Sequence, residues 1–240
     1  MSEYKKNIPG ENTSVENLPN GNAPAGNKPV GNAAAEKISA GEHKSKSLAD
    51  KIAHIVRIVS VPPVLATALI LLLAIKRDDI ITCASEAVVA FIGLAIFPVL
   101  AYPLAAIIPS LRKKGRDGQR NTAFVTCFAG YVLSCLYASL TMHASQYRML
   151  CFTYFFSVII LLILNKIVHI RASGHACSVA GPIVLIAAYL GITWVIIGIV
   201  LYALILWASL RTHRHTLSEF VWGSLSSVVS AAISYLIFLY

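Results

Sequence analysis

The chain has 240 residues, of which 57% are hydrophobic and only 13% are charged. It is too hydrophobic to be an ordinary soluble domain of this length, and it indicates a membrane protein. The formal net charge is +9. A basic membrane domain favours an anionic ligand or an anionic lipid surface. Nucleic acid is disfavoured because the basic residues are spread over short loops without interleaved aromatic residues.

Residues 1–45 have a different composition from the rest of the chain. They include the run NLPNGNAPAGNKPVGN, whose Gly, Pro and Asn leave nothing to offset the entropy of an unfolded chain. The sequence therefore predicts a disordered polar tail over 1–45.

Residues 46–60 follow the tail and carry apolar side chains at helical spacing, with cations among them. The residues concerned are Leu48, Lys51, Ile52, Ile55, Val56 and Arg57. This pattern suits an interfacial helix that leads into the first membrane span. It is equally compatible with the solvated first turns of that span.

Residues 61–240 are predicted to form an all-α transmembrane bundle of about six to seven spans. A span needs roughly 20 apolar residues to cross a hydrocarbon core of about 30 Å. Seven runs qualify, at about 57–76, 85–109, 122–142, 149–169, 174–190, 192–210 and 218–239. The apolar stretch between His175 and Ser209 is too long for one span, so we expect it to fold back near Gly191.

The charged residues between spans are unequally distributed. The connections on the side of the N-terminal tail carry Arg112, Lys113, Lys114, Arg116, Arg120, Arg171, Arg211 and Arg214, and the opposite connections carry only Lys76, Arg77 and Arg148. By the positive-inside rule, we expect a multi-pass protein of the cell membrane with its N-terminus and its basic face in the cytoplasm.

Three polar clusters fall on that basic face, at 113–121, 171–175 and 211–219. Ser173 is a predicted N-cap, so the backbone N–H groups of Gly174 and His175 would point out of a helix N-terminus, where an anion is favoured. His215 and Glu219 are four residues apart and share a helix face. A carboxylate there can accept the proton of one imidazole nitrogen and leave the other nitrogen as a nucleophile.

These clusters resemble the three motifs of the type 2 phosphatidic acid phosphatases, or lipid phosphate phosphatases, which share an active site with vanadium haloperoxidases. The first motif is Lys, six residues and Arg-Pro, the second is Pro-Ser-Gly-His, and the third is Ser-Arg, five residues, His, three residues and Asp. The matching residues are Lys113 and Arg120, then Ser173-Gly174-His175, then His215. The departures are Asn121 and Ala172 for the two prolines, Ala208-Ser209 for Ser-Arg, and Glu219 for Asp.

The resemblance implies a role for each matching residue. His215 would attack phosphorus to form a phosphohistidine, Glu219 would orient it, and His175 would protonate the leaving oxygen. Phosphoryl oxygens would be bound by Lys113, Arg120, Ser173 and Gly174. Ser209 cannot replace the arginine of the third motif, so Arg211, Arg214 or Arg171 would have to substitute for it, and Arg211, four residues before His215, is the first choice. The resemblance covers about residues 50–240 and implies a lipid or polyprenyl phosphate or diphosphate as substrate, with no metal or other cofactor.

Other hypotheses remain open from the sequence. The protein could bind or move lipid phosphates without turnover, or it could use His175, His213, His215 and Glu219 for metal transport or zinc hydrolysis. His213 competes with His215 for the nucleophilic role. We expect His143 and His169 at the interface without chemistry, and Glu86 extending from a span end toward water. The lipid substrate and the oligomeric state are not determined by the sequence.

Overall fold

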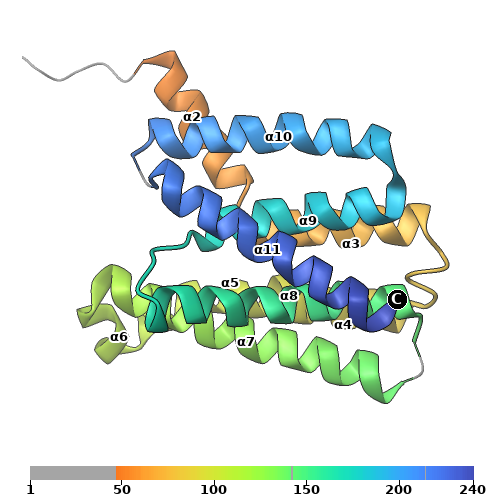
Figure 1. Cartoon of the computed structure of the whole chain (residues 1–240). Coiled ribbons are helices and arrows are strands. Elements are labelled where there is room, and N and C mark those ends of the chain that lie inside the picture. Colours follow the sequence, from red (N-terminus) through yellow and green to blue (C-terminus); the bar gives the residue numbers. More distant parts are fainter. Residues whose placement is uncertain (1–46, 142, 214) are drawn as a thin grey trace, which may run out of the picture. The chain divides into compact units, whose positions relative to one another are not determined.

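The computed structural model describes residues 47–141, 143–213 and 215–240, and over these residues it is a bundle of helices without strands (Figure 1). The predicted all-helical fold is thus confirmed. The predicted disordered tail lies outside the described residues.

The helices follow one another with short connections. The N-terminal half contains α2 (Leu48–Val59), α3 (Pro62–Lys76), α4 (Ala84–Phe91), α5 (Phe97–Ile107), α6 (Pro109–Lys113) and α7 (Gly115–Leu140). The C-terminal half contains α8 (Ser145–Leu162), α9 (Gly174–Leu190), α10 (Ile192–Arg211) and α11 (Leu217–Phe238). Two π-helical segments continue these helices without a break. Ile92–Ile96 joins α4 to α5, and Ile163–Ile167 extends α8.

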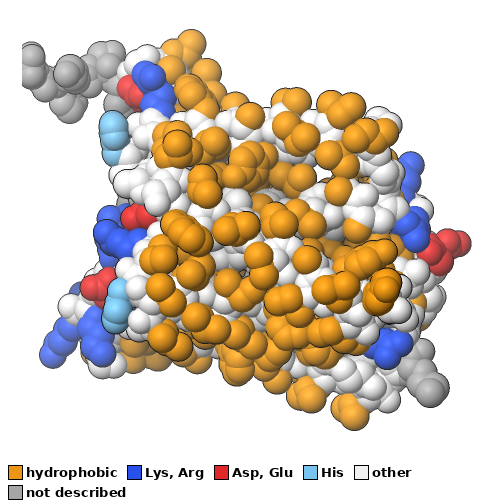
Figure 2. Space-filling view, viewed as in Figure 1, with side chains coloured by type: hydrophobic (Ala, Val, Ile, Leu, Met, Phe, Trp, Pro, Cys, Tyr) orange, Lys and Arg blue, Asp and Glu red, His pale blue; other side chains and the backbone are white. Residues whose placement is uncertain are grey.

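Several of these continuous helical segments have the length and composition of membrane spans. Five qualify among the described residues, namely Ala84–Ile107, Gly115–Leu140, Ser145–Ile167, Ile192–Arg211 and Leu217–Phe238. Helices α2 and α3 qualify together as a sixth, although they are bent by 60°, and α9 is a shorter apolar helix of 17 residues. Hydrophobic side chains cover the broad face in Figure 2, while charged side chains gather at two opposite ends. The chain is a multi-pass membrane protein.

The connection between the predicted spans 85–109 and 122–142 is shorter than expected, because most of residues 110–121 are helical. Helix α6 occupies its start, and α7 begins at Gly115, seven residues before the predicted span. Gly115 has a φ of +55°, which glycine adopts readily, and this non-helical conformation separates α6 from α7. Asp117 in the first turn of α7 is favoured by the helix dipole. Lys113 and Arg120 therefore belong to different helices.

Helices α9 and α10 fold back on each other as predicted. Gly191 joins them with a φ of +83° and a ψ of −175°. An L-residue with a side chain is strained at such a positive φ, so glycine supplies the turn.

Helix α11 lies against α8 and α9 (Figure 1). Its buried face is made of small residues, including Gly223, Ser226, Ser227, Ser230, Ala231 and Ser234. Small side chains allow helix backbones in a membrane to approach closely, which supplies packing where the hydrophobic effect between helices is absent. This close packing fixes the position of the N-terminal end of α11, which carries Glu219.

The expected placement of Glu86 is wrong. Glu86 is fully buried, and its Oε2 accepts hydrogen bonds from the backbone N–H groups of Thr82 and Cys83 and from the Thr82 hydroxyl. Its Oε1 lies 2.5 Å from His143 Nδ1. The reason is local, since Glu86 is the N3 residue of a capping box that begins α4, which draws the carboxylate inward.

Candidate functional site

The N-terminus of α9 provides an anion-binding backbone. Ser173 is its N-cap, as predicted, and its Oγ accepts a hydrogen bond of 3.2 Å from the Ala176 N–H. The N–H groups of the first helical turn have no partner within a helix, and they face a position where the dipole favours negative charge. A Cβ added at Gly174 would have no atom within 4 Å, so the backbone there is open to a ligand.

The N-terminus of α11 holds the imidazole of His215. His215 Nδ1 lies 3.1 Å from Glu219 Oε2, which is the contact expected from their spacing. Nε2 of His215 takes no part in this contact. Thr216 caps α11 and forms a capping box with Glu219, whose Oε2 lies 3.4 Å from the Thr216 N–H. The Thr-x-x-Glu pattern that signals this cap is visible in the sequence, although the sequence prediction missed it.

Glu219 connects the second and third clusters. Its backbone oxygen accepts a 2.9 Å hydrogen bond from the Ser173 N–H, and its Oε1 lies 3.7 Å from Arg171 Nε. The approach depends on Gly223, because a Cβ there would lie 2.1 Å from the Ser173 carbonyl oxygen. The N-termini of α9 and α11 are therefore held together by backbone contact.

Arg120 is joined to the same region by a residue that the sequence prediction missed. Asn165 Oδ1 accepts a hydrogen bond from Arg120 and another, of 3.2 Å, from the Ala172 N–H. Asn165 Nδ2 donates to the carbonyl oxygens of Leu161 and Ala172. A lone Asn in an apolar run was the available signal, since a polar side chain within a span needs partners.

His175 contacts a second unpredicted residue, Ser60. The two side chains are joined by a hydrogen bond of 3.3 Å between Ser60 Oγ and His175 Nε2. Ser60 is buried at the bend between α2 and α3. His215 and Arg57 both lie close enough to the His175 ring to interact with it electrostatically, so the histidines of the second and third clusters are neighbours.

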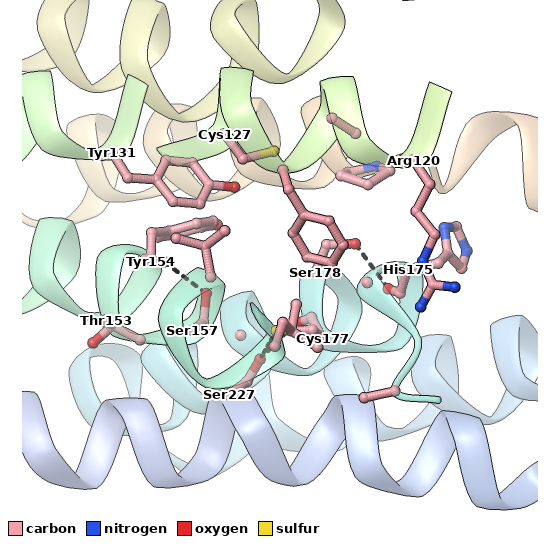
Figure 3. A pocket seen from close by; sticks show the side chains of 18 of the residues that line it. Arg120, Cys127, Tyr131, Thr153, Tyr154, Ser157, His175, Cys177, Ser178 and Ser227 are labelled. Carbon is pink, nitrogen blue, oxygen red and sulfur yellow. Dashed lines mark hydrogen bonds between the residues drawn. The ribbon is translucent and has the colours of Figure 1, made fainter. Parts of the chain in front are cut away.

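A cavity of about 250 Å³ opens beside these groups, and Arg120, Gly174 and His175 all line it. Figure 3 shows Arg120 and His175 at one end of this cavity and Tyr131 and Tyr154 at the other. The first and second clusters therefore meet at one cavity. His215 precedes α11 and Glu219 lies in its first turn, next to Ser173 of the second cluster, but neither residue lines the cavity.

Three cations predicted to bind phosphate either lie away from the cavity or are paired with a carboxylate. Lys113 is exposed at the end of α6 and does not line the cavity. Arg211 Nε donates to Asp50 Oδ1 of α2 at 2.8 Å. Arg171 has a side chain that is 77% exposed, and its Nε lies 3.7 Å from Glu219 Oε1. Arg211, the first choice to substitute for the missing arginine, is therefore paired away from the His215–Glu219 pair, and Arg171 is the one that contacts Glu219. Arg214, the third substitute, lies outside the described residues.

The structure separates His213 from His215. His213 has a φ of +49°, is exposed, and borders a shallow depression with Asp50, Trp207 and Arg211. Ser209, at the position where the resemblance expects arginine, is fully buried, and its Oγ has no hydrogen-bond partner among the described residues. Within the described part of the chain, no group of three His, Cys, Asp or Glu residues is arranged to hold a metal ion.

Comparisons of the chain with models of protein families, with curated proteins and with solved structures found no match.

Proposed function

We propose that this protein is an integral membrane phosphatase that hydrolyses a lipid or polyprenyl phosphate or diphosphate, as a divergent member of the type 2 phosphatidic acid phosphatases. The observation that carries the proposal is the meeting of Arg120, Gly174 and His175 at one cavity, with the His215–Glu219 pair tied to it through Ser173. Residues from three separate segments thus provide a cation, an open helix N-terminus and two imidazoles around one site.

The proposed reaction has two steps. In the first, Nε2 of His215 attacks phosphorus while its Nδ1–H donates a hydrogen bond to Glu219, and the bond from phosphorus to the leaving oxygen breaks as His175 protonates that oxygen. In the second, the now neutral His175 takes a proton from water, the water oxygen attacks phosphorus, and the phosphorus–nitrogen bond breaks. Arg120 and the N–H groups at Gly174 stabilise the charge on the equatorial oxygens.

The arginine that Ser209 replaces is the main departure from the family pattern. We propose that Arg171 takes its place, because it already lies 3.7 Å from the carboxylate that orients His215. Arg211 is the weaker candidate, since its guanidinium is paired with Asp50.

The decisive experiment is phosphate release by purified protein carrying His215→Ala. We expect the loss of the nucleophile to lower kcat by at least about a thousandfold, because no second imidazole is paired with a carboxylate at this site. His213→Ala is the matched control and should keep its activity. Equal release by His215→Ala and the unchanged protein would overturn the proposal, and loss of activity on complete chelation would favour the metal hypothesis instead.

A non-catalytic protein that binds or transports lipid phosphates is the second candidate. The buried Ser209 favours it, because the site then has one cation fewer than the family pattern requires. Binding of a lipid phosphate that depends on Arg120, together with no phosphate release at any pH, would support this alternative.

A further inference from the structure

Arg120 is held in place by a neutral side chain. Its guanidinium donates a hydrogen bond to Oδ1 of Asn165, and no carboxylate of the described residues forms an ion pair with it. A hydrogen bond to an amide restricts the guanidinium but leaves its positive charge uncompensated, whereas a carboxylate partner would offset that charge. The charge of Arg120 therefore stays available to an anion in the cavity that this residue lines.

The amide of Asn165 uses every hydrogen bond that it can make. Besides the bond from Arg120, Oδ1 accepts one of 3.2 Å from the Ala172 N–H. Nδ2 donates to the carbonyl oxygens of Leu161 and Ala172, at 2.8 and 3.2 Å. An asparagine amide has two donors and one oxygen with two lone pairs, so no capacity is left over. The four partners together fix which way the amide points.

A π-helical turn carries Asn165 to this position. The residue lies in the middle of Ile163–Ile167, the segment that extends α8. At its end the Val168 N–H donates to the carbonyl oxygen of Ile163, five residues earlier, at 2.9 Å. Such turns are rare within helices and occur frequently at functional sites. The helix therefore departs from regular α geometry at the residue that contacts Arg120.

Through Ala172, Asn165 also fixes the start of α9. Ala172 precedes the N-cap Ser173, and both its N–H and its carbonyl oxygen are bonded to the Asn165 amide. Arg120 and Gly174 both line the cavity, and Figure 3 shows Arg120 at the same end of it as His175. One amide thus connects the cation to the helix N-terminus that is proposed to bind the same phosphoryl group.

From these contacts we propose that Asn165 is a positioning residue, which holds Arg120 and the N-terminus of α9 in register around one phosphoryl group without neutralising the arginine. The inference rests on the proposed phosphatase function and adds to it a residue outside the three motifs. Groups that stabilise the equatorial oxygens act best when they are already in place as charge develops, which is what such a residue provides.

A neighbouring pair provides the matched control. Asn121 Oδ1 accepts a hydrogen bond of 2.8 Å from Lys166 Nζ, so this pair joins the same two segments one residue further along each. The pair is exposed, and neither residue lines the cavity. Asn121→Ala therefore removes an amide link of the same kind without removing the partner of Arg120.

The test is a double-mutant cycle on phosphate release from a lipid phosphate. We expect Asn165→Ala to lower kcat/KM by about tenfold, because a guanidinium without its partner is no longer ordered toward the phosphate. In protein that already carries Arg120→Ala, the same change should lower kcat/KM by no more than about threefold, the part that acts through α9. Asn121→Ala should leave kcat/KM unchanged. Equal factors in the two backgrounds would mean that Asn165 does not act through Arg120, and would overturn the inference.

A second variant keeps the size of the side chain and one acceptor oxygen. Asn165→Asp places a carboxylate beside Arg120, which then competes with the phosphate, and kcat/KM should again fall by about tenfold or more. Unchanged kcat/KM in this variant would contradict the inference. Thermal unfolding in detergent shows which variants fold. Asn165 is half-buried, so water can reach the groups that Asn165→Ala leaves free. If neither variant at this position folds, the residue is structural and the inference fails.

A binding measurement separates failure of this inference from failure of the phosphatase function. Butylphosphonate has a carbon–phosphorus bond in place of the ester, so its binding can be measured by calorimetry without hydrolysis. We expect Asn165→Ala to weaken this binding by about tenfold. That result without phosphate release from any lipid phosphate would refute the phosphatase function and keep the positioning role. Phosphate release with equal factors in the double-mutant cycle would keep the function and refute the role.

Discussion

At the scale of single residues, Ser60 is the contact that most directly affects the proposed acid. Its hydroxyl is buried and lies 3.3 Å from His175 Nε2, so it restricts the orientation of the imidazole. We predict that Ser60→Ala lowers kcat by about fivefold with little change in KM, since one buried hydrogen bond contributes about 1 kcal/mol. Steady-state kinetics on a lipid phosphate would measure both constants.

The controls for Ser60 use neighbouring hydroxyls. Ser60→Thr keeps the hydroxyl and should restore most of kcat. Thr67→Ala removes a hydroxyl that donates to Pro63 within α3, and it should leave kcat unchanged. An equal fall in Ser60→Ala and Thr67→Ala would mean that the effect is general loss of packing and not positioning of His175.

The buried contacts of Glu86 lead to a prediction about the stability of the fold. The carboxylate is fully buried, accepts three hydrogen bonds and pairs with His143 at the end of the bundle away from the proposed site. We predict that Glu86→Gln lowers the free energy of unfolding by about 3 kcal/mol, because an amide NH2 group replaces one of the two buried carboxylate oxygens and cannot accept a hydrogen bond. Thermal unfolding in detergent would measure this change.

The control for Glu86 is Asp79→Asn. Asp79 pairs with Arg77 at an exposed position, and the Arg77 guanidinium lowers the pKa of that carboxyl. Solvent screens this pair, so its loss should affect unfolding much less. If the two variants unfold alike, the buried pair does not stabilise the fold as argued.

At the scale of helices, the crossing of α11 over the start of α9 sets the geometry of the site. Gly223 allows the backbone of α11 to touch Ser173, and a Cβ there would lie 2.1 Å from its carbonyl oxygen. We predict that Gly223→Ala moves the His215–Glu219 pair away from α9 and lowers kcat/KM by about tenfold or more, since catalysis is sensitive to misplacement of about 1 Å. Phosphate release would measure it.

Gly181→Ala is the matched control for this helix crossing. It lies in the same pair of helices, but its Cβ would be in ordinary contact with Ser227. We expect Gly181→Ala to leave kcat/KM nearly unchanged, measured with methyl phosphate so that binding of a hydrocarbon chain does not contribute. Should Gly223→Ala retain full activity, the contact with Ser173 would not position the site.

At the scale of the whole molecule, the basic end of the bundle leads to a prediction about the orientation of the protein in the membrane. The N-terminus of α2 and the start of α9 and α11 lie toward one end of the bundle, and that end carries most of the loop cations (Figures 1 and 2). We predict that the N-terminus faces the cytoplasm. A tag at the N-terminus should be digested in inside-out vesicles and protected in sealed right-side-out vesicles, and the reverse pattern would contradict the prediction.

The sequence predicted the local parts of the site because they depend on helical periodicity. The Ser173 N-cap and the His215–Glu219 contact each involve residues within four positions of one another, where the helix itself fixes the geometry. The start of α7 was misplaced because charge was taken to mark a loop, whereas charged residues are good helix formers at the end of a span.

Composition and span length alone determined that this is an all-helical membrane protein, because an apolar run of about 20 residues has few other ways to satisfy its backbone in lipid. Tertiary structure decided which cations reach the site. The contacts of Arg120 with Asn165, Ser60 with His175 and Arg211 with Asp50 join residues 45, 115 and 161 positions apart. Such pairs depend on how the helices cross, and crossing depends on close packing of small residues that no local pattern records.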